Sequence, residues 1–120
     1  RYHVATSYAR SLKAACRAEL ESLRERARHV ELPSPSRLKR WLIDPEALPE
    51  GERTRLAHLA EHGRVIEKVV AMRAELSSLW ARSTETSEQL LARLQDWCHR
   101  AESSGIPPLA QFSLQLKRYA

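Results

Sequence analysis

The chain has 120 residues and a formal net charge of +5, with 20 lysines and arginines against 15 aspartates and glutamates. It has no run of about 18 apolar residues, which excludes a membrane-spanning helix, and no secretory signal pattern. Few glycines and many alanine, leucine, arginine and glutamate residues favour an all-α fold. A chain of this length buries one modest core, so we expect a single helical domain over residues 1–120. Because it begins with Arg1, we expect a fragment of a larger protein.

The first predicted element is a long amphipathic helix. Apolar residues at steps of three and four predict it over residues 2–31, about 40 Å in length, and Pro33 and Pro35 end it. Its apolar stripe consists of Val4, Tyr8, Leu12, Cys16, Leu20, Leu23, Ala27 and Val30. Tyr2, Val4 and Tyr8 extend this stripe to the start of the chain, where a bundle of ordinary helices no longer covers it. Exposed apolar stripes usually mark interfaces, so these three residues are a predicted partner interface.

The middle of the chain predicts three shorter helices. Helix-start signals occur at Ser36, at Asp44 with Pro45, and at Pro49. They predict a short helix capped by Ser36, a second helix that ends near His62 and Gly63, and a third over residues 64–82. The inward residues of these helices are Leu38, Trp41, Leu42, Leu56, Leu59, Ala60, Val65, Ile66, Val69, Val70, Leu76, Leu79 and Trp80. A polar link over residues 83–87 follows, and Thr84 or Thr86 caps the next helix.

The last third of the chain predicts a helical hairpin. Gly105 stands where a helix C-terminus needs a left-handed residue, and Pro107 fits the first turn of the next helix. Two apolar stripes face each other across this break: Leu90, Leu94, Trp97, Cys98 and Ala101 before it, and Leu109, Phe112, Leu116 and Tyr119 after it. The predicted fold is therefore a compact, largely antiparallel bundle of five or six helices, with a long N-terminal helix and a C-terminal helical hairpin.

The hairpin also carries a family resemblance. Its block consists of Trp97, His99, Ala101, Glu102, Ser104, Gly105, Ile106, Leu109, Phe112, Leu116 and Tyr119. The block resembles the C-terminal cytosolic tail of bacterial aerobic fatty acid desaturases, which are diiron membrane enzymes. A weaker form resembles the helical insert of some DDE-type transposases. Residues 65–80 are similar to the middle helix of the desaturase tails and residues 2–10 to the segment before it, whereas residues 33–53 match less well.

This resemblance implies a non-catalytic accessory domain, because the histidine clusters that bind the two irons in desaturases are missing from the chain. The parent activity would be the synthesis of unsaturated fatty acids. The implied partners are the membrane-embedded part of the same polypeptide or a second copy of the chain. The implied location is cytoplasmic, at the inner membrane if the domain is attached to a desaturase. Two alternatives stay open: a nucleic-acid-binding fragment of a transposase-like protein, and a free-standing self-association module.

The charge pattern suggests where an anionic surface would bind. Arg37, Lys39 and Arg40 form a short basic cluster beside Trp41, and Lys117 and Arg118 follow the last acidic residue. Basic residues close to an anionic leaflet gain about 1 kcal/mol each, and nucleic acid attracts the same charges. The alternative is that most charges, such as Arg17 with Glu21, pair along helix faces. We expect weak lipid binding at the five named cations and no sequence-selective DNA binding.

Metal-binding and catalytic signals are weak. His58 and His62 lie four residues apart, the spacing at which two imidazoles meet one metal ion, but the sequence predicts no third ligand. Cys98 and His99 are adjacent on a helix and point about 100° apart, so they do not form a nucleophile and base. We therefore expect no enzymatic activity, no metal, no cofactor and no small-molecule substrate in this chain. Cys16 and Cys98 fit buried free thiols of a reducing compartment, and a Cys16–Cys98 disulfide is the alternative.

Overall fold

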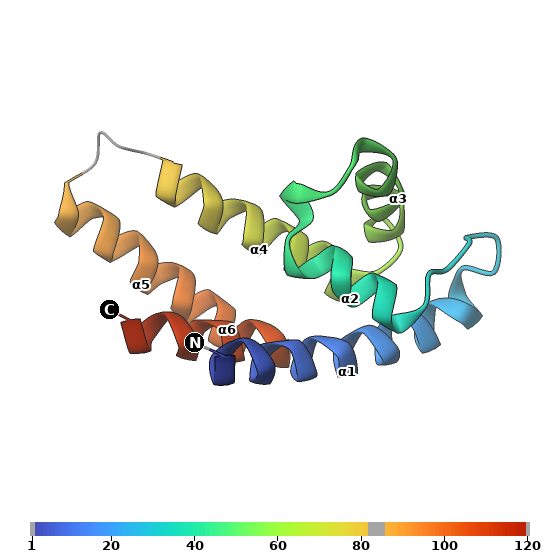
Figure 1. Cartoon of the computed structure of the whole chain (residues 1–120), viewed down its shortest axis with the longest axis horizontal. Helices are drawn as coiled ribbons and strands as arrows, with labels where there is room; N and C mark the ends of the chain where they lie inside the picture. Colours follow the sequence, from blue (N-terminus) through green and yellow to red (C-terminus); the bar gives the residue numbers. More distant parts are fainter. Residues whose placement is uncertain (1, 82–85, 120) are drawn as a thin grey trace.

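Helices follow one another along the chain, with one short 3₁₀ turn among them (Figure 1). The structure, a computed structural model, describes residues 2–81 and 86–119, except for the side chains of residues 2–7, Trp80 and Tyr119. The elements are α1 (Tyr2–Arg26), α2 (Pro35–Ile43), η1 (Pro45–Ala47), α3 (Glu50–Ala60), α4 (Arg64–Ala81), α5 (Ser87–Ser103) and α6 (Pro107–Tyr119). No strand occurs in the described ranges. The predicted all-α bundle is confirmed.

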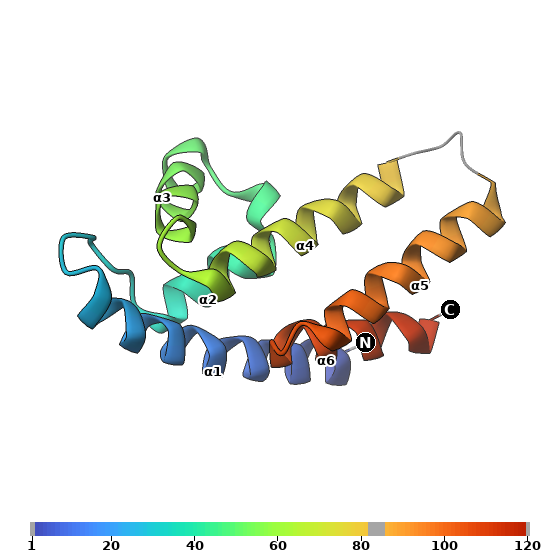
Figure 2. The same cartoon turned by 180° about the vertical axis from the view of Figure 1, so that it is seen from behind.

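The longest helix forms one edge of the molecule. α1 packs against α2, α4 and α6, and Figures 1 and 2 show it along the bottom of the molecule, with α2, α3 and α4 above it. One cluster of buried side chains draws on all six described helices. Trp41 and Trp97, at 1% and 0% exposure, belong to it, so these two tryptophans are core residues. No helix within the described ranges is long and apolar enough to cross a membrane.

α1 ends earlier than the sequence predicts. The helix stops at Arg26, not at residue 31, after a last helical hydrogen bond from Ala27 N to Leu23 O of 2.8 Å. A turn follows, closed by a bond from Val30 N to Ala27 O of 3.1 Å. Val30 still packs against the core, but it does so from the segment that returns the chain to α2. Val30 therefore fits the helical spacing of α1 without belonging to that helix.

A buried carboxylate of α1 positions the start of α4. Glu19 is 8% exposed, and its Oε2 accepts hydrogen bonds from the backbone N–H groups of Val65 (2.7 Å) and Ile66 (3.2 Å). These N–H groups have no partner within their own helix, so the carboxylate caps α4 from another element. A Cβ at Gly63 would lie 2.7 Å from the same oxygen. Gly63 stands directly before α4 and, because it lacks a Cβ, leaves room for the Glu19 carboxylate.

The helix caps correct one prediction and confirm another. Ser34, not Ser36, caps α2: its side chain accepts from Arg37 N at 3.2 Å, and Pro35 occupies the first turn, where it needs no N–H partner. At the start of α5, Thr86 forms a capping box with Gln89, with both bonds at 3.1 Å. Thr84 and the rest of the link over 82–85 lie outside the described residues.

The C-terminal hairpin has the predicted turn and core. Gly105 has a φ of +76°, the only positive φ in the described ranges, and α6 begins at Pro107. The Trp97 and Phe112 rings meet edge to face at 5.8 Å between centroids. Trp97 Nε1 also donates to Met72 O of α4 at 2.9 Å, which fixes the hairpin to the middle helix. Met72, at 2% exposure, is a core residue that the predicted stripe of α4 did not include.

Candidate nucleic-acid interface

The predicted basic cluster lies on the short helix α2. Leu38, Trp41 and Leu42 face the core, which leaves Arg37 and Arg40 exposed and Lys39 half-buried. Lys39 lies close enough to α1 to act on Cys16. The pKa of this thiol is raised to about 12. Burial is the largest cause and the charge of Glu19 the second, whereas the charge of Lys39 lowers the pKa. Among the described residues, none of the three cations of the cluster has an ion-pair partner.

A second and longer row of cations lies on α1. Arg10, Lys13, Arg17 and Arg24 are separated by three, four and seven residues, which puts them on one face of the helix. We call these four residues the α1 basic stripe. Three of them are exposed and Lys13 is half-exposed. The stripe is about 21 Å long from Arg10 to Arg24, at 1.5 Å per residue.

The side chains of the α1 basic stripe have no ion-pair partner in the described part of the chain. In particular, the expected pairing of Arg17 with Glu21 does not occur there. Arg17 and Arg24, together with Glu21 and residues 32–35, line a hollow of about 580 Å³ beside the start of α2. The stripe therefore continues toward the basic cluster of α2. Sequence reasoning missed this surface, although the 3-4-7 spacing beside the apolar stripe was visible.

Other arginines of the molecule are bound within the fold. Arg73 Nη2 donates to Ile43 O at 2.6 Å, and its guanidinium lies 4.7 Å from the Phe112 ring centroid. Arg100 donates to Glu75 and to Asp96. The hydrogen bond to Glu75 is the largest cause that raises the pKa of Arg100, and it is also the largest cause that lowers the pKa of Glu75. These cations tie helices together, whereas the stripe and the α2 cluster face solvent.

The two predicted cations near the C-terminus lie apart from the α2 cluster. Lys117 forms an ion pair with Glu102 at 2.7 Å, and the hydrogen bond from Lys117 is the largest cause that lowers the pKa of Glu102. Arg118 is exposed. Figure 1 shows the end of α6 at the far end of the molecule from the start of α2. The structure therefore does not bring the five predicted contact residues onto one surface.

The opposite side of the molecule is acidic. Asp44, Glu46, Glu50 and Glu52 lie between the end of α2 and the first turn of α3. None of their carboxylates has an ion-pair partner within the described ranges. Figures 1 and 2 show η1 and α3 on the side away from α1. The charge of the molecule is thus divided between a basic edge and an acidic edge.

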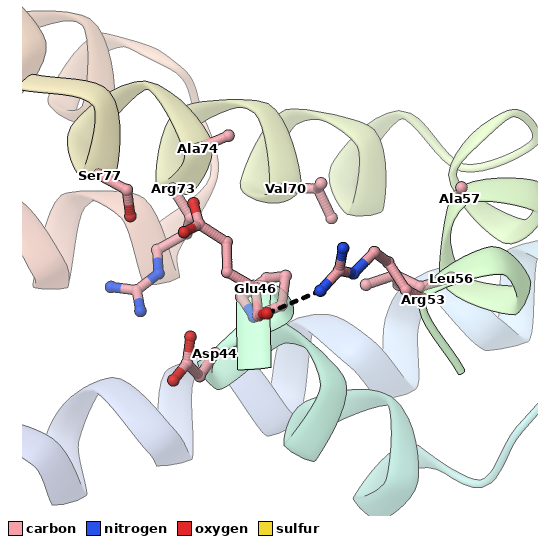
Figure 3. Close-up of a pocket in the computed structure, with 10 residues that line it drawn as sticks. Asp44, Glu46, Arg53, Leu56, Ala57, Val70, Arg73, Ala74 and Ser77 are labelled. Atoms are coloured by element: carbon pink, nitrogen blue, oxygen red, sulfur yellow. Dashed lines mark hydrogen bonds between the residues drawn. The ribbon is translucent and has the colours of Figure 1, made fainter. Parts of the chain in front are cut away.

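A hollow of about 470 Å³ lies on this acidic side, between η1, α3 and α4. Figure 3 shows Asp44, Glu46, Arg53 and Arg73 around it. Arg53 donates to the backbone oxygens of Glu46 (2.9 Å) and Leu48 (3.4 Å). Because both charge signs occur and the cations are already bonded, the hollow favours neither an anion nor a cation.

Histidines gather at one end of the molecule. The His62 ring lies 5.4 Å from that of His58 and 5.3 Å from that of His29, centroid to centroid. His29 is the neighbour that sequence reasoning did not foresee. In the described ranges, however, no three histidine, cysteine, aspartate or glutamate side chains are arranged to hold a metal ion. Cys98 is buried at 5% exposure and His99 is exposed, so their side chains lie in different environments.

Tyr8 lies in the core and not on an exposed stripe. It is 6% exposed, and its ring meets that of Phe112 edge to face at 5.0 Å between centroids. Burial is the largest cause that raises its pKa. The side chains of Tyr2 and Val4 lie outside the described residues. A partner interface at the start of α1 stays a prediction, and Tyr8 is not available on its surface.

The molecule is thus all-helical in the described ranges, and its longest helix carries cationic side chains that have no ion-pair partner there. The family model described as Transposase, of the DDE type and the ISL3 group, matches residues 1–120. The chain belongs to this transposase family, because the match covers its whole length. Neither a curated protein nor a solved structure matches it. The transposase part of the resemblance is confirmed, and nothing supports a fatty acid desaturase tail or a role in lipid metabolism.

Proposed function

We propose that this chain is a DNA-binding helical part of a transposase and that it is not itself catalytic. Membership of a transposase family supports action on DNA. The α1 basic stripe is the observation that carries the proposal, because its four cations have no acidic partner in the described part of the chain. Free cations on one face displace the counterions condensed on phosphate groups, which is the main source of sequence-independent affinity for DNA.

The proposed contact surface combines the stripe with the α2 cluster. The hollow beside Arg17 and Arg24 reaches Ser34 and Pro35, at the start of α2. Of the predicted cations, Arg37, Lys39 and Arg40 therefore belong to this surface, whereas Lys117 and Arg118 do not. The acidic edge on the far side favours one orientation toward a polyanion. In this proposal the chemistry of transposition belongs to other residues of the parent protein.

Two pairs of substitutions test the proposal. Arg17→Gln with Arg24→Gln removes two charges from the stripe, and Lys117→Gln with Arg118→Gln removes two charges from the end of α6. Affinity for a labelled duplex of about two helical turns is measured over a range of salt concentrations. The stripe pair should lower affinity by about tenfold and make the slope of log K against log salt shallower by about 2. The α6 pair should change the affinity by less than about twofold.

Equal effects of the two pairs would show that only net charge matters, and the proposed surface would be wrong. Vesicles that contain phosphatidylserine form the second arm of the test, because an anionic leaflet attracts the same cations. Binding to vesicles that the stripe pair abolishes, together with no DNA binding by the wild type, would overturn the proposal in favour of a membrane surface. Circular dichroism checks that each variant keeps its helical content.

A further inference from the structure

We infer that the α1 basic stripe binds the DNA backbone and does not read base sequence. This inference rests on the proposed function and specifies the kind of DNA contact. The first support is the chemistry of the side chains that reach outward. On the exposed face of α1, the residues beside the stripe are Ala14, Ala18, Glu21 and Glu25. Alanine offers no hydrogen bond to a base edge, and a carboxylate is repelled by phosphate. The long cationic side chains of the stripe are therefore the ones on this face that suit a contact with phosphate.

The side chains that read adenine are missing from this surface. Asparagine and glutamine recognise adenine through paired hydrogen bonds. The sequence contains no asparagine, and its glutamines are Gln89, Gln95, Gln111 and Gln115. All four lie on α5 or α6. α6 packs on the face of α1 that carries Tyr8, and Arg17, nine residues after Tyr8, lies on the opposite face.

The packing of α1 also opposes entry into a groove. A helix that reads bases fits the major groove, which is about 12 Å wide. A single helix with its side chains already has a diameter of about 10–12 Å. α2 packs against α1, and residues at the start of α2 line the same hollow as Arg17 and Arg24. Two packed helices have axes about 8–10 Å apart, so α1 could enter the groove only with α2 held outside it, and the start of α2 lies directly beside Arg17 and Arg24. The stripe can follow phosphates along the rim.

Arginine is the side chain of this surface best suited to reading a base, because its planar fork makes two hydrogen bonds to guanine. A substitution that keeps the charge separates the two modes. Lysine binds phosphate as a point charge but lacks the planar fork of arginine. We therefore replace Arg10, Arg17 and Arg24 by lysine in one variant and by glutamine in another. Both variants, and the wild type, are titrated with GC-rich, AT-rich and mixed duplexes of equal length.

The lysine variant should keep its affinity within about threefold of the wild type, and the glutamine variant should lose more than about tenfold. The wild type should bind the three duplexes within about threefold of one another. Such a surface suits DNA whose sequence varies rather than one fixed recognition sequence.

A lysine variant that loses as much affinity as the glutamine variant would overturn this inference, as would a preference of about tenfold or more for one duplex. Either result would leave the proposed DNA-binding function in place. A glutamine variant that binds like the wild type would instead refute the stripe as the DNA contact, and both conclusions would fail.

Discussion

Glu19 and Gly63 are coupled through one oxygen atom. Glu19 Oε2 is fixed by two backbone N–H groups of α4, and a Cβ at Gly63 would lie 2.7 Å from it. Gly63→Ala should therefore lower the free energy of unfolding by about 1–3 kcal/mol through overpacking. Glu19→Ala should cost a similar amount, about 1–3 kcal/mol, because it leaves N–H groups without a partner. Urea denaturation of both variants measures these losses.

The double variant shows whether the two losses share a cause. Once Glu19 is alanine, the oxygen that Gly63→Ala would strike is absent, so the second substitution should cost about 1 kcal/mol less than it does alone. Losses that simply add would mean that the contact is relieved in some other way. Glu19→Gln is a useful control, because it retains one acceptor oxygen and should lose less stability than Glu19→Ala.

Cys16 should make the protein less stable at high pH. In the folded state the pKa of its thiol is raised from 9.0 to about 12, and burial is the largest cause. Above pH 9 the unfolded chain loses this proton while the folded chain keeps it. The contribution of the protonated thiol to the stability of the fold is thus complete below about pH 9 and is lost as the pH rises toward 12. From about pH 8 to about pH 10 the free energy of unfolding should fall by about 1 kcal/mol for this one proton.

Cys16→Ala removes that proton and should flatten the fall. The residue is 2% exposed, so the variant also starts from a lower stability, and the comparison is between slopes and not between absolute values. Tyr8 also makes the free energy of unfolding fall as the pH rises, because burial, the largest cause, raises its pKa above 10.0. Its effect begins at a higher pH than that of Cys16. An unchanged slope in Cys16→Ala would show that the thiol does not cause the loss.

Two glycines give a matched test of the α5–α6 turn. Gly105 has a φ of +76°, and a Cβ there would meet nothing within 4 Å. Gly105→Ala should therefore cost about 1–2 kcal/mol, from the left-handed backbone alone. A Cβ at Gly51, in the first turn of α3, would also meet nothing within 4 Å, and Gly51 has no positive φ. Gly51→Ala should stabilise the protein, by up to about 1 kcal/mol. Thermal denaturation that gave both substitutions the same sign would contradict this account.

Elements whose signals are local could be predicted from sequence. Gly105 and Pro107 each act on their own helix end, so spacing and residue type were enough to place them, and the same signals reduced the cap of α5 to Thr84 or Thr86. The end of α1 could not be placed in the same way. Val30 continues the helical pattern, but the packing of α2 on α1 requires the chain to turn after Arg26. The periodicity of apolar residues indicates that a residue is buried, but it does not show which element of the fold buries it.

The candidate site was harder to predict than the fold. The interaction of Glu19 with α4 spans 46 residues, and no local pattern indicates a partner so distant. The α1 basic stripe was visible as a spacing, but a helix also favours pairing of Arg17 with Glu21. Sequence alone could not decide whether that pair forms. Lys117 was predicted as a contact for an anionic surface, and its ion pair with Glu102 could not be read from the sequence because Glu102 lies in the preceding helix.

At the scale of the whole molecule, the net charge of +5 conceals two opposite edges. α1, which carries the basic stripe, and α3, whose first turn contains Glu50 and Glu52, lie on opposite sides of the molecule (Figure 1). The molecule is 27 Å by 25 Å across its two short axes. At physiological ionic strength, charges act over about 8 Å. Each edge should therefore interact with DNA almost independently of the other.

This separation predicts an asymmetry between equal changes of net charge. Glu50→Gln with Glu52→Gln raises the net charge by two on the acidic edge, and Arg17→Gln with Arg24→Gln lowers it by two on the stripe. At physiological salt the first pair should change duplex affinity by less than about twofold, because screening removes its effect at the stripe. The second pair should lower the affinity by about tenfold. At low salt, where the screening length increases to about 30 Å, the acidic pair should begin to strengthen binding. A gain from the acidic pair as large as the loss from the stripe pair, already at physiological salt, would mean that net charge and not the arrangement of α1 governs the interaction with DNA.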